Sequence, residues 1–490
     1  MTGKYQHPIS ISGWPPGRFS RNGSRCSLAA GWGVTSYERD GDALRKVAPG
    51  AAPDDPVRPL RGTGRGSENY NLLVPRQLTY NRTLQLGATN KWTLVATLFL
   101  VSALNYADRT SITSVYALLK TDLGFTDVAL GLMGSLFLWS YALASPLGGY
   151  VGDRVSRGWL IIASLAGWSL ITLLTGLANA PWQLLALRVA LGVVEAMYLP
   201  AAFALVAEHH GQSTRAAALG IIALGNSVGL VGGGTLAGYL GENFGWRSPL
   251  ITLGVAGLAL ALACRFVLPL DNQRSSATAT PVSFGRAVAS LASVPTIVII
   301  AVASLLTSIG SWTFINWLPL YFHENFGLTL ARAGFLGSSL VGISGALTLT
   351  VGGYVSDRVA EGGIHRRMWM QAILILCAAP VLLTFLVSKQ QTHVMGALVL
   401  YAILRTGADL NITPLLCDLT RPDHRSTVFG LTNMLNTMAG GLGVFVAGAL
   451  KATVGLDGVF AAVAGTLALD AALLFTGCVF YLKRDLARKL

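Results

Sequence analysis

Charged side chains are scarce in this chain. Asp, Glu, Lys and Arg make up 12% of its 490 residues, whereas 52% of the residues are hydrophobic. Soluble domains carry about twice that share of charge, because charge keeps their surfaces dispersed, so a soluble protein is excluded. The five cysteines are scattered, with no CxxC pair and no metal-ligand spacing. Their arrangement predicts no disulfide framework and no metal site.

Signatures of catalysis are missing as well. The sequence has no P-loop of the form GxxxxGK[ST] and no cluster of His and Cys residues. We therefore predict no ATP hydrolysis, no catalytic residues, no cofactor and no enzyme activity. Any work that the protein does must then be driven by a gradient of ions or solutes.

Long apolar runs are present instead, and they follow one another from Lys91 onward. A run of about 18 or more residues with few charges is long enough to cross a bilayer as a helix. The predicted fold class is an all-α polytopic membrane protein with twelve transmembrane helices in two six-helix halves. The predicted spans are 92–119, 127–151, 159–179, 181–207, 216–241 and 248–269, then 294–321, 329–355, 368–388, 394–417, 427–451 and 457–482.

The domain boundaries follow from these spans. The N-terminal half covers residues 91–269, a polar cytoplasmic connector covers 270–293, the C-terminal half covers 294–482 and a cytoplasmic C-terminus covers 483–490. Residues 1–90 carry twelve Lys/Arg and six Asp/Glu, with Gly and Pro throughout and no apolar core of signal-peptide length. This composition predicts a disordered basic cytoplasmic tail. A mis-assigned start is the other reading, since no further methionine precedes Met133.

Lysine and arginine are distributed unevenly between the two sets of loops. The loops on the side of residues 152–158, together with the C-terminus, hold fifteen of them, and the opposite loops hold five. The excess marks the cytoplasmic side, so both termini are predicted inside, in a multi-pass protein of the plasma (inner) membrane. Much of the net charge of +13 is thus a topology signal, and we expect no nucleic acid partner.

One octet occurs almost unchanged in both halves. GGYVGDRV at 148–155 returns as GGYVSDRV at 352–359, which is the pattern of two related halves of a transporter. The octets resemble the cytoplasmic loop signature of the major facilitator superfamily. The resemblance implies that these loops latch the two halves together on the cytoplasmic side. The residues of this predicted cytoplasmic gate are Gly149, Asp153, Arg154, Arg157, Asp357 and Arg358.

Few ionisable residues remain within the predicted spans. They are Asp108, Arg109, Arg188, Glu195, Arg405, Asp409 and Asp470. Such residues usually face a water-filled cavity or a partner, because a charge at the bilayer centre costs about 2.5–3.5 kcal/mol. Arg188 and Glu195, seven residues apart, share one helix face, and this pairing suits an anionic substrate and an exchangeable proton. A structural ion pair between spans one and four is the alternative.

The second-half charges are open to more than one interpretation. Arg405 and Asp409 lie four residues apart, so they can form a self-neutralised pair on one helix or contact substrate. Asp470 lies alone in span twelve, where a structural or cavity-edge role is expected.

A closer resemblance lies in NYADR of span one, WSYALASPLGGYVGDR of span two and LRVALGVVEAMYLP of span four. Together these are similar to the anion:cation symporter branch of the superfamily, which includes sugar-acid carriers. The resemblance implies proton coupling by Asp108 and Glu195. It implies substrate binding by Arg109, Arg188 and Asn433, while Asn226 stands where the sugar-acid members have glutamine. Tyr141 and Arg405 complete the predicted substrate-binding set.

The sequence thus predicts a secondary active transporter that works by alternating access and moves a small organic anion with protons. Its expected partners are that anion, protons and the lipid bilayer, and we expect a monomer. A Spinster-like carrier of lysolipids and a drug:proton antiporter are the alternatives within the superfamily. Span five has GLVGGG without the proline of the antiporter signature, which disfavours the last reading. A solute sensor is the alternative from another class.

Overall fold

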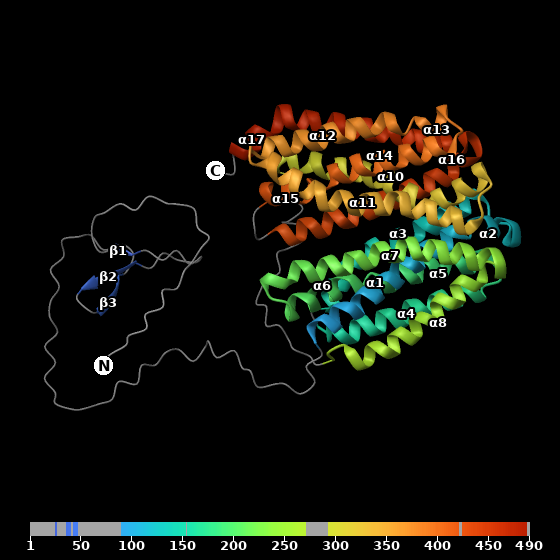
Figure 1. Ribbon diagram of the computed structural model, residues 1–490, viewed down its shortest axis with the longest axis horizontal. Helices are drawn as coiled ribbons and strands as arrows, with labels where there is room; N and C mark the ends of the chain where they lie inside the picture. The colour runs from blue at the N-terminus through green and yellow to red at the C-terminus, as the bar shows by residue number, and fades with distance from the viewer. Residues whose placement is uncertain are drawn as a thin grey trace, which may run out of the picture. The chain divides into compact units, whose positions relative to one another are not determined.

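Two compact units make up the chain, residues 1–84 and 85–490, and each is described by itself. In a computed structural model, the described residues are 25–26, 36–40, 43–47, 90–152, 154–270, 293–420 and 424–487 (Figure 1). The first unit contains a three-stranded antiparallel sheet that the sequence did not predict. Its strands are β1 (Arg25–Cys26), β2 (Ser36–Asp40) and β3 (Ala43–Val47). Apart from this sheet and Asn90, the predicted tail lies outside the described residues.

The first half of the second unit is a bundle of helices, coloured blue to green in Figure 1. Asn90 begins it, because its side chain accepts a hydrogen bond from the Trp92 amide and caps the first helix. The elements are α1 (Lys91–Ser114), α2 (Tyr116–Leu123), α3 (Asp127–Gly152), α4 (Arg157–Leu177), α5 (Pro181–Glu195), α6 (Tyr198–His209), α7 (Gln212–Phe244) and α8 (Arg247–Val267).

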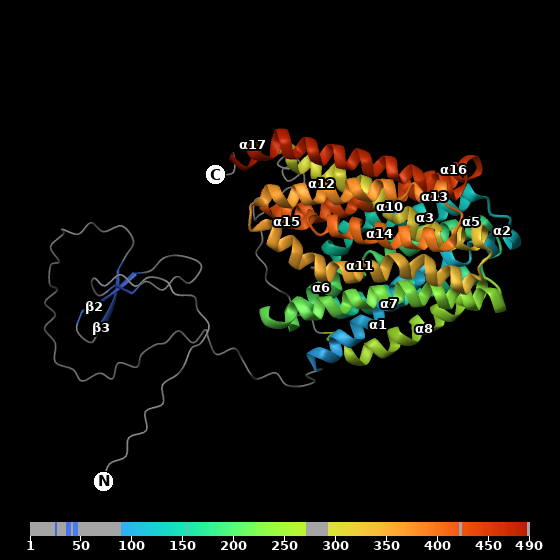
Figure 2. The same ribbon diagram turned by 45° about the horizontal axis from the view of Figure 1, so that its top comes forward.

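The second half forms a second bundle, yellow to red, beside the first, and Figure 2 shows both bundles in a turned view. Thr329 caps the helix that follows it, because its hydroxyl accepts from the Arg332 amide at 3.3 Å. The elements are α10 (Pro295–Phe326), α11 (Leu330–Ala360), α12 (Ile364–Val381), α13 (Thr384–Val387), α14 (Gln391–Asp409), α15 (Ile412–Leu419), α16 (Arg425–Thr476), the π-helix η2 (Gly477–Tyr481) and α17 (Leu482–Ala487).

These elements confirm the twelve predicted spans. Four spans consist of two helices in line, namely α1 with α2, α5 with α6, α12 with α13 and α14 with α15. The long helix α16 holds two spans, because Gly455 breaks it at φ 66° and ψ 173°. By length and hydropathy alone, nine stretches of the described chain qualify as spans; the last, Thr427–Ala487, contains two. The α1–α2 and α14–α15 spans, which carry intramembrane charge pairs, are not among the nine.

Two of the breaks have the same local cause. Proline cannot donate a backbone hydrogen bond, and its ring clashes with the carbonyl group four residues earlier. Pro200 lies four residues after Ala196, where α5 gives way to α6. Pro414 lies four residues after Leu410, where α14 gives way to α15. The break therefore recurs at the corresponding place in each half, just beyond the charged residues of spans four and ten.

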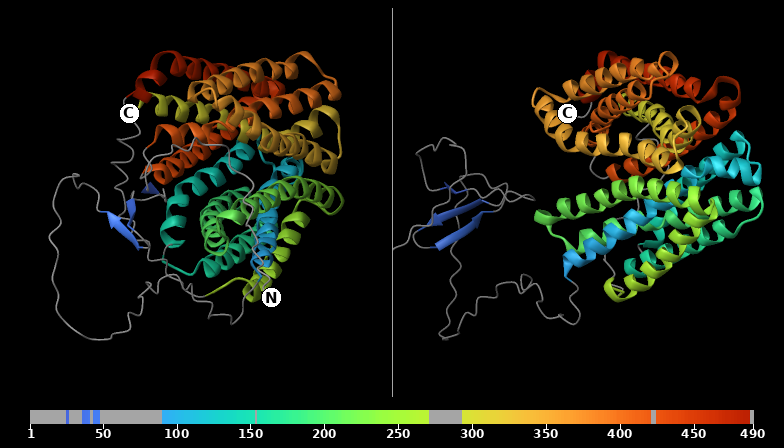
Figure 3. Two further views of the ribbon diagram at one scale, coloured as in Figure 1. Left: turned by 60° about the vertical axis from the view of Figure 1, so that its left-hand side comes forward. Right: turned by 45° about the vertical axis from the view of Figure 1, so that its right-hand side comes forward.

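We define two ends of the bundle. The arginine-rich end is where α3 and α11 end, and the opposite end is where they begin; the further views of Figure 3 show the two bundles between these ends. Gly124 and Gly327 stop α2 and α10 at the opposite end in left-handed conformations, with φ of 66° and 61°. Glycine adopts this conformation without steric cost, so the same helix stop is used in both halves.

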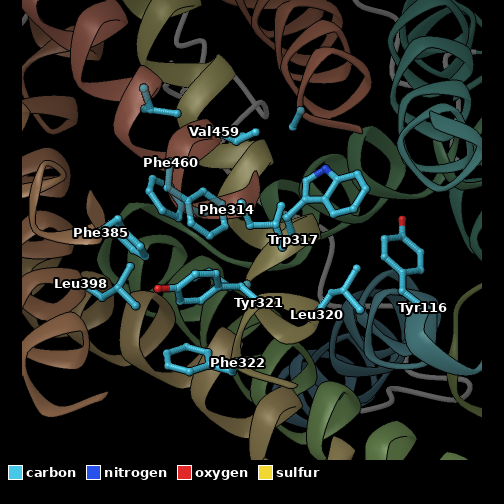
Figure 4. Close-up of a cluster of buried hydrophobic side chains, with 14 of the residues drawn as sticks. Tyr116, Phe314, Trp317, Leu320, Tyr321, Phe322, Phe385, Leu398, Val459 and Phe460 are labelled. Atoms are coloured by element: carbon cyan, nitrogen blue, oxygen red, sulfur yellow. The ribbon is translucent and has the colours of Figure 1, made fainter. Parts of the chain in front are cut away.

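A buried aromatic cluster packs the second half (Figure 4). The rings of Phe314 and Phe460 stack with their centroids 4.6 Å apart, and Phe385 and Tyr321 pack around them. On its other side, Trp317 of α10 meets Tyr116 of α2, with ring centroids 5.8 Å apart. The cluster thus extends from the second half to a residue of the first.

Candidate functional site

The intramembrane charges of the first half meet in one cluster. Nε of Arg109 on α1 donates to Oε2 of Glu195 on α5 at 2.9 Å, and the Glu195 side chain is fully buried. The Arg109 guanidinium lies over the rings of Phe137 and Tyr141, 5.1 and 4.8 Å from their centroids. An arginine held by one carboxylate and by aromatic faces keeps other N–H groups available for a second acceptor.

Arg188 and Asp108 complete this cluster, with Arg188 4% exposed and Asp108 1% exposed. The charged groups around Asp108 are Glu195 and Arg188, and Trp168 and Thr172 of α4 are its polar neighbours. Among the described residues, neither Asp108 carboxylate oxygen accepts a hydrogen bond, and Nε of Arg188 has no acceptor. These three buried atoms are available to a ligand, a proton or water.

Small residues let the helices that carry these charges lie close together. Gly192 on α5 lies directly against the backbone of α3. A Cβ at this position would be only 2.5 Å from the Phe137 carbonyl oxygen. Glycines of α7 face the backbone of α1 at Ala103 and Ala107 in the same way. The close approach brings Arg188 and Glu195 of α5 toward α1 and α3. Small residues at helix interfaces are the usual means of packing within membranes.

The second half has its own polar assembly. Nη2 of Arg405 and Oδ2 of Asp409 are 2.5 Å apart, which confirms that these residues can pair on their own helix. A cavity of about 350 Å³ lies beside this pair. Hydroxyl and amide groups line it, from Ser304, Thr307, Ser308, Ser311, Thr413 and Asn436.

Asp470 is buried next to this cavity. The Thr307 hydroxyl donates to its Oδ2 at 2.5 Å, while its Oδ1 has no hydrogen-bond donor among the described residues. Asp470 is 1% exposed and thus lies behind Thr307, away from solvent. The sequence did not predict this contact between spans seven and twelve.

A third, small space lies beside the arginines of the first half. It measures about 20 Å³, and Arg109 and Arg188 line it from the first half. Trp312 and Ile315 of α10 line it from the second half, and the same two residues line the larger cavity beside Arg405. The two sets of intramembrane charges therefore face a shared region between the halves.

A cavity of about 340 Å³ lies nearer the arginine-rich end. Tyr141 and Asn433, both of which belong to the predicted substrate-binding set, line it from α3 and α16. The rest of its lining is mainly apolar, with Leu199, Phe203 and Met434. Asn226 of α7 is partly buried, but it lines none of the three cavities described here.

Hydrogen bonds join the two halves along only part of their length. Ser135 of α3 donates to the Gly441 carbonyl at 2.6 Å, and the Trp139 indole donates to the Met438 carbonyl at 3.1 Å. Nearer the opposite end, a Cβ on Gly131 would lie 2.9 Å from the Val444 carbonyl oxygen. Over 140–152 and 343–360, by contrast, the described residues make no hydrogen bond or ion pair that joins the halves. These polar contacts thus lie toward the opposite end.

Four charged residues close the opposite end, and we call them the closing network. Lys120 and Asp127 belong to the first half, and Glu324 and Lys451 to the second. Each lysine contacts both acids, at 2.9 and 3.3 Å for Lys120 and at 2.8 Å in both cases for Lys451. Both lysines are among the five cations of the opposite loops that indicated topology, and their pairing was not predicted. The sequence did contain a signal for it, because Asp127 and Glu324 also lie at the ends of predicted spans on this side.

Electrostatics favours the charged form of this network. Partial burial opposes the charge on Lys120, but its hydrogen bond to Asp127 and the charge of Glu324 outweigh burial and raise the pKa of Lys120. The Lys451 side chain is only 8% exposed, and its ammonium group lies 5.8 Å from the centroid of the Trp317 ring. The network is consequently less screened by salt than a surface ion pair.

The residues of the predicted cytoplasmic gate lie at the arginine-rich end, except that Asp153 falls outside the described residues. Their contacts stay within one half: Arg157 pairs with Glu208, and Asp357 accepts from Arg367 at 2.7 Å. Arg358 lies over the ring of Tyr354 on its own helix, and Arg154, just beyond the end of α3, lies over the ring of Tyr150. Around Gly149, an added Cβ would meet no atom within 4 Å. The latch between halves remains a prediction for another conformation.

The one GxSxG sequence, GNSVG at 225–229, lies inside the continuous helix α7. A serine nucleophile of that motif requires a strand-to-helix turn. Within the described residues, no group of three or more His, Cys, Asp or Glu side chains is placed to hold a metal ion.

Comparison with known proteins gives the family. The model of the Major Facilitator Superfamily matches residues 98–444 and 300–488. An "MFS-type efflux pump" of Mycolicibacterium smegmatis is 28% identical over 408 residues, which cover 81% of this chain and 92% of that protein. The probable galactarate/D-glucarate transporter GudP of Bacillus subtilis is 27% identical over 303 residues, covering 56% of this chain and 66% of that protein.

A solved structure shares the fold. It is a bacterial homologue of the human lysosomal transporter Spinster in an inward-facing, unoccupied conformation, with a TM-score of 0.73 and 20% identity. The match covers 81% of this chain and 99% of that one. Twelve spans in two halves, intramembrane charges around shared cavities and the family match lead to one conclusion: this chain is a multi-pass membrane transporter of the Major Facilitator Superfamily.

Proposed function

We propose that the protein is a proton-coupled symporter of a small organic anion. The observation that supports this most directly is the Arg109–Glu195 ion pair beside Arg188, which is buried without an acceptor for its Nε. A permanently charged arginine binds a carboxylate through two hydrogen bonds. A buried glutamate next to it is able to exchange a proton with the cavity.

Charge balance gives the coupling its direction. Asp108 and Glu195 carry two negative charges, and Arg109 and Arg188 carry two positive charges, so the empty cluster is neutral. A bound monoanion leaves one excess negative charge, which is costly in a buried site. One proton on Glu195 restores neutrality and frees Arg109 for the carboxylate. The anion and the proton therefore bind better together than either alone.

The remaining predicted residues have roles in the same cycle. Tyr141 and Asn433 line the route from the arginine-rich end and contact the substrate as it leaves. Arg405 offers a second cation beside the cavity of the second half. Asn226 reaches substrate only after the helices rearrange. The protein acts as a monomer in the plasma membrane with both termini in the cytoplasm.

If the arginine-rich end faces the cytoplasm, as proposed, the structure corresponds to an inward-facing state. The closing network and the contacts near Gly131 shut the outer end. The arginine-rich end, which lacks cross-half contacts among its described residues, faces the cytoplasm. In the outward-facing state the closing network separates. The gate residues Gly149, Asp153, Arg154, Arg157, Asp357 and Arg358 then come together.

Proteoliposomes that contain a pH-sensitive dye provide the test. Adding a panel of sugar acids, dicarboxylates and monocarboxylates outside should acidify the lumen for one class of acid. Glu195→Gln should abolish this acidification, whereas Glu242→Gln, the same change at an exposed glutamate of α7, should leave it intact. Uptake of the acid without any proton movement by the wild-type protein would contradict proton coupling.

Export of amphiphiles is the second candidate. The apolar lining of the 340 Å³ cavity, with Leu199, Phe203 and Met434, favours it, as does similarity to a protein named an efflux pump. A ligand that binds only the folded protein raises its unfolding temperature. Stabilisation by lysolipids that is equal in the wild type and in Arg188→Ala would favour export. Stabilisation by an organic acid that is lost in Arg188→Ala would favour symport.

A further inference from the structure

The second half repeats the chemical arrangement of the first. In the first half, the Arg109–Glu195 pair lies beside Asp108, a buried carboxylate that accepts no hydrogen bond from the described residues. In the second half, the Arg405–Asp409 pair lies beside Asp470, a buried carboxylate with one free oxygen. The spans differ, because Asp108 is on α1 and Asp470 is on α16, so sequence repetition does not explain the similarity.

We propose that Asp470 is a second exchangeable proton site, reached from the polar cavity of the second half through Thr307. Its Oδ2 accepts from the Thr307 hydroxyl at 2.5 Å, and Thr307 itself lines the cavity of about 350 Å³. The Thr307 hydroxyl therefore lies between the carboxylate and a space large enough for several water molecules. This contact provides a short path for a proton.

Burial explains why the site holds a proton in this conformation. Asp470 is 1% exposed, and its Oδ1 lacks a donor among the described residues. A carboxylate in the membrane interior is costly unless its charge is paired and hydrogen-bonded. No described arginine, lysine or histidine pairs with it, whereas Arg405 is taken by Asp409. The protonated form avoids this cost.

The surrounding charges make the site responsive to the transport cycle. From α14, the charged group that faces Asp470 is Asp409, and Arg405 holds that group at 2.5 Å. From α10, the facing group is the neutral Thr307 hydroxyl. If an anion displaces Asp409 from Arg405, the negative charge of Asp409 is no longer balanced and proton retention on Asp470 is favoured. When the anion leaves, the pair re-forms and proton retention on Asp470 is favoured less, so the cavity and its pH then decide whether the proton stays.

This inference deepens the proton coupling of the proposed function, but it is tested on substrate-free protein. Purified full-length protein in lipid nanodiscs is examined by infrared difference spectroscopy over a pH series. We expect a C=O band of a protonated, buried carboxyl group that disappears as the pH rises and is missing in Asp470→Asn. Asp457→Asn is the control, because it removes a carboxylate that pairs with Lys389 at the opposite end.

Thr307→Val tests the hydroxyl contact separately. Valine has nearly the same shape and cannot donate, so the Asp470 band should shift to higher frequency while the protein stays folded. A wild-type spectrum identical to that of Asp470→Asn, or an Asp470 band that does not change with pH, would overturn the proposal. If the band titrates but proteoliposomes show no proton-driven uptake, the site stands and the proposed symport fails.

Discussion

Arg109 of α1 and Glu195 of α5 form a buried ion pair, with Nε and Oε2 2.9 Å apart, in the wall between the two halves. The pair holds two spans together, so it serves as the structural link that was one of the two predicted alternatives. It also borders the space lined by Arg188, which makes the link breakable by a ligand. Under the proposed function, one contact therefore serves both packing and transport.

Glu195→Gln should uncouple transport from the pH gradient. The amide keeps the shape and one hydrogen-bond acceptor for Arg109, but it cannot bind or release a proton. Counterflow of labelled acid should persist, while uptake driven by a pH gradient should fall to the level of empty liposomes. The check is to measure both on one reconstituted sample. Loss of counterflow together with gradient-driven uptake would assign Glu195 a binding role instead.

Arg188→Lys should weaken substrate binding even though it keeps the positive charge. A guanidinium binds a carboxylate through two parallel hydrogen bonds, whereas an ammonium group binds it as a point charge. We expect about a tenfold rise in the dissociation constant, which corresponds to the loss of one hydrogen bond to a charged group. Titration calorimetry with the acid identified in the dye assay measures this. An unchanged constant would remove Arg188 from the binding site.

Lys451→Gln should shift the protein away from the state described here. The lysine contacts Asp127 and Glu324 at 2.8 Å, so its removal leaves two acids from opposite halves close together. Double electron–electron resonance between spin labels on either side of the opposite end should show a larger share of long distances.

A matched change provides the control for this shift. Lys389→Gln at the same end breaks a pair with Asp457 that lies within the second half, so it should leave the distance distribution unchanged. Equal effects of the two changes would show that surface charge at this end, and not the link between halves, sets the conformation.

The closing network should not respond to pH near neutrality. The pKa of Lys120 is raised, so the stabilisation from its charge is fully present below the ordinary lysine pKa and is lost only as the pH rises through the raised value. The same spin-label distances should therefore stay constant from neutral pH up to about pH 10. A transition near neutral pH would place the responsible groups elsewhere in the protein.

The sequence was informative where the physical signal is local. Long apolar runs predicted twelve spans, and the spacing of Arg405 and Asp409 predicted their pair as one of two alternatives, because both signals depend on neighbouring residues. The proline breaks at Pro200 and Pro414 were also readable from sequence in the same way, but they were not predicted.

Contacts between distant spans left no such signal. Lys451 and Asp127 are 324 residues apart in the chain, and only the packing of α16 on α3 brings them together. Thr307 and Asp470 are 163 residues apart, and nothing in their local sequences marks them as partners. The candidate site was predictable in its charged residues, since charges in apolar runs are conspicuous. Its hydroxyl lining was not, because serine and threonine are common in spans.

Gly192→Ala should destabilise the protein and impair transport together. A Cβ at this position would lie 2.5 Å from the Phe137 carbonyl oxygen and 2.9 Å from the Tyr141 amide nitrogen, so α5 must move away from α3. Overpacking of this kind typically costs about 1–3 kcal/mol, which exceeds the gain of at most about 1 kcal/mol from replacing a helical glycine by alanine. The displacement also moves Arg188 and Glu195, which lie on the same helix.

Thermal unfolding in detergent and uptake in proteoliposomes measure the two effects. Gly396→Ala on α14 is the matched control, because an added Cβ there meets no atom within 4 Å. We expect a lower unfolding temperature and slower uptake for Gly192→Ala, and an unchanged or higher temperature with normal uptake for Gly396→Ala. If Gly192→Ala unfolds at the wild-type temperature, the helices α3 and α5 can separate enough to accept the added methyl group. The geometry of the arginine cluster would then not depend on this close contact.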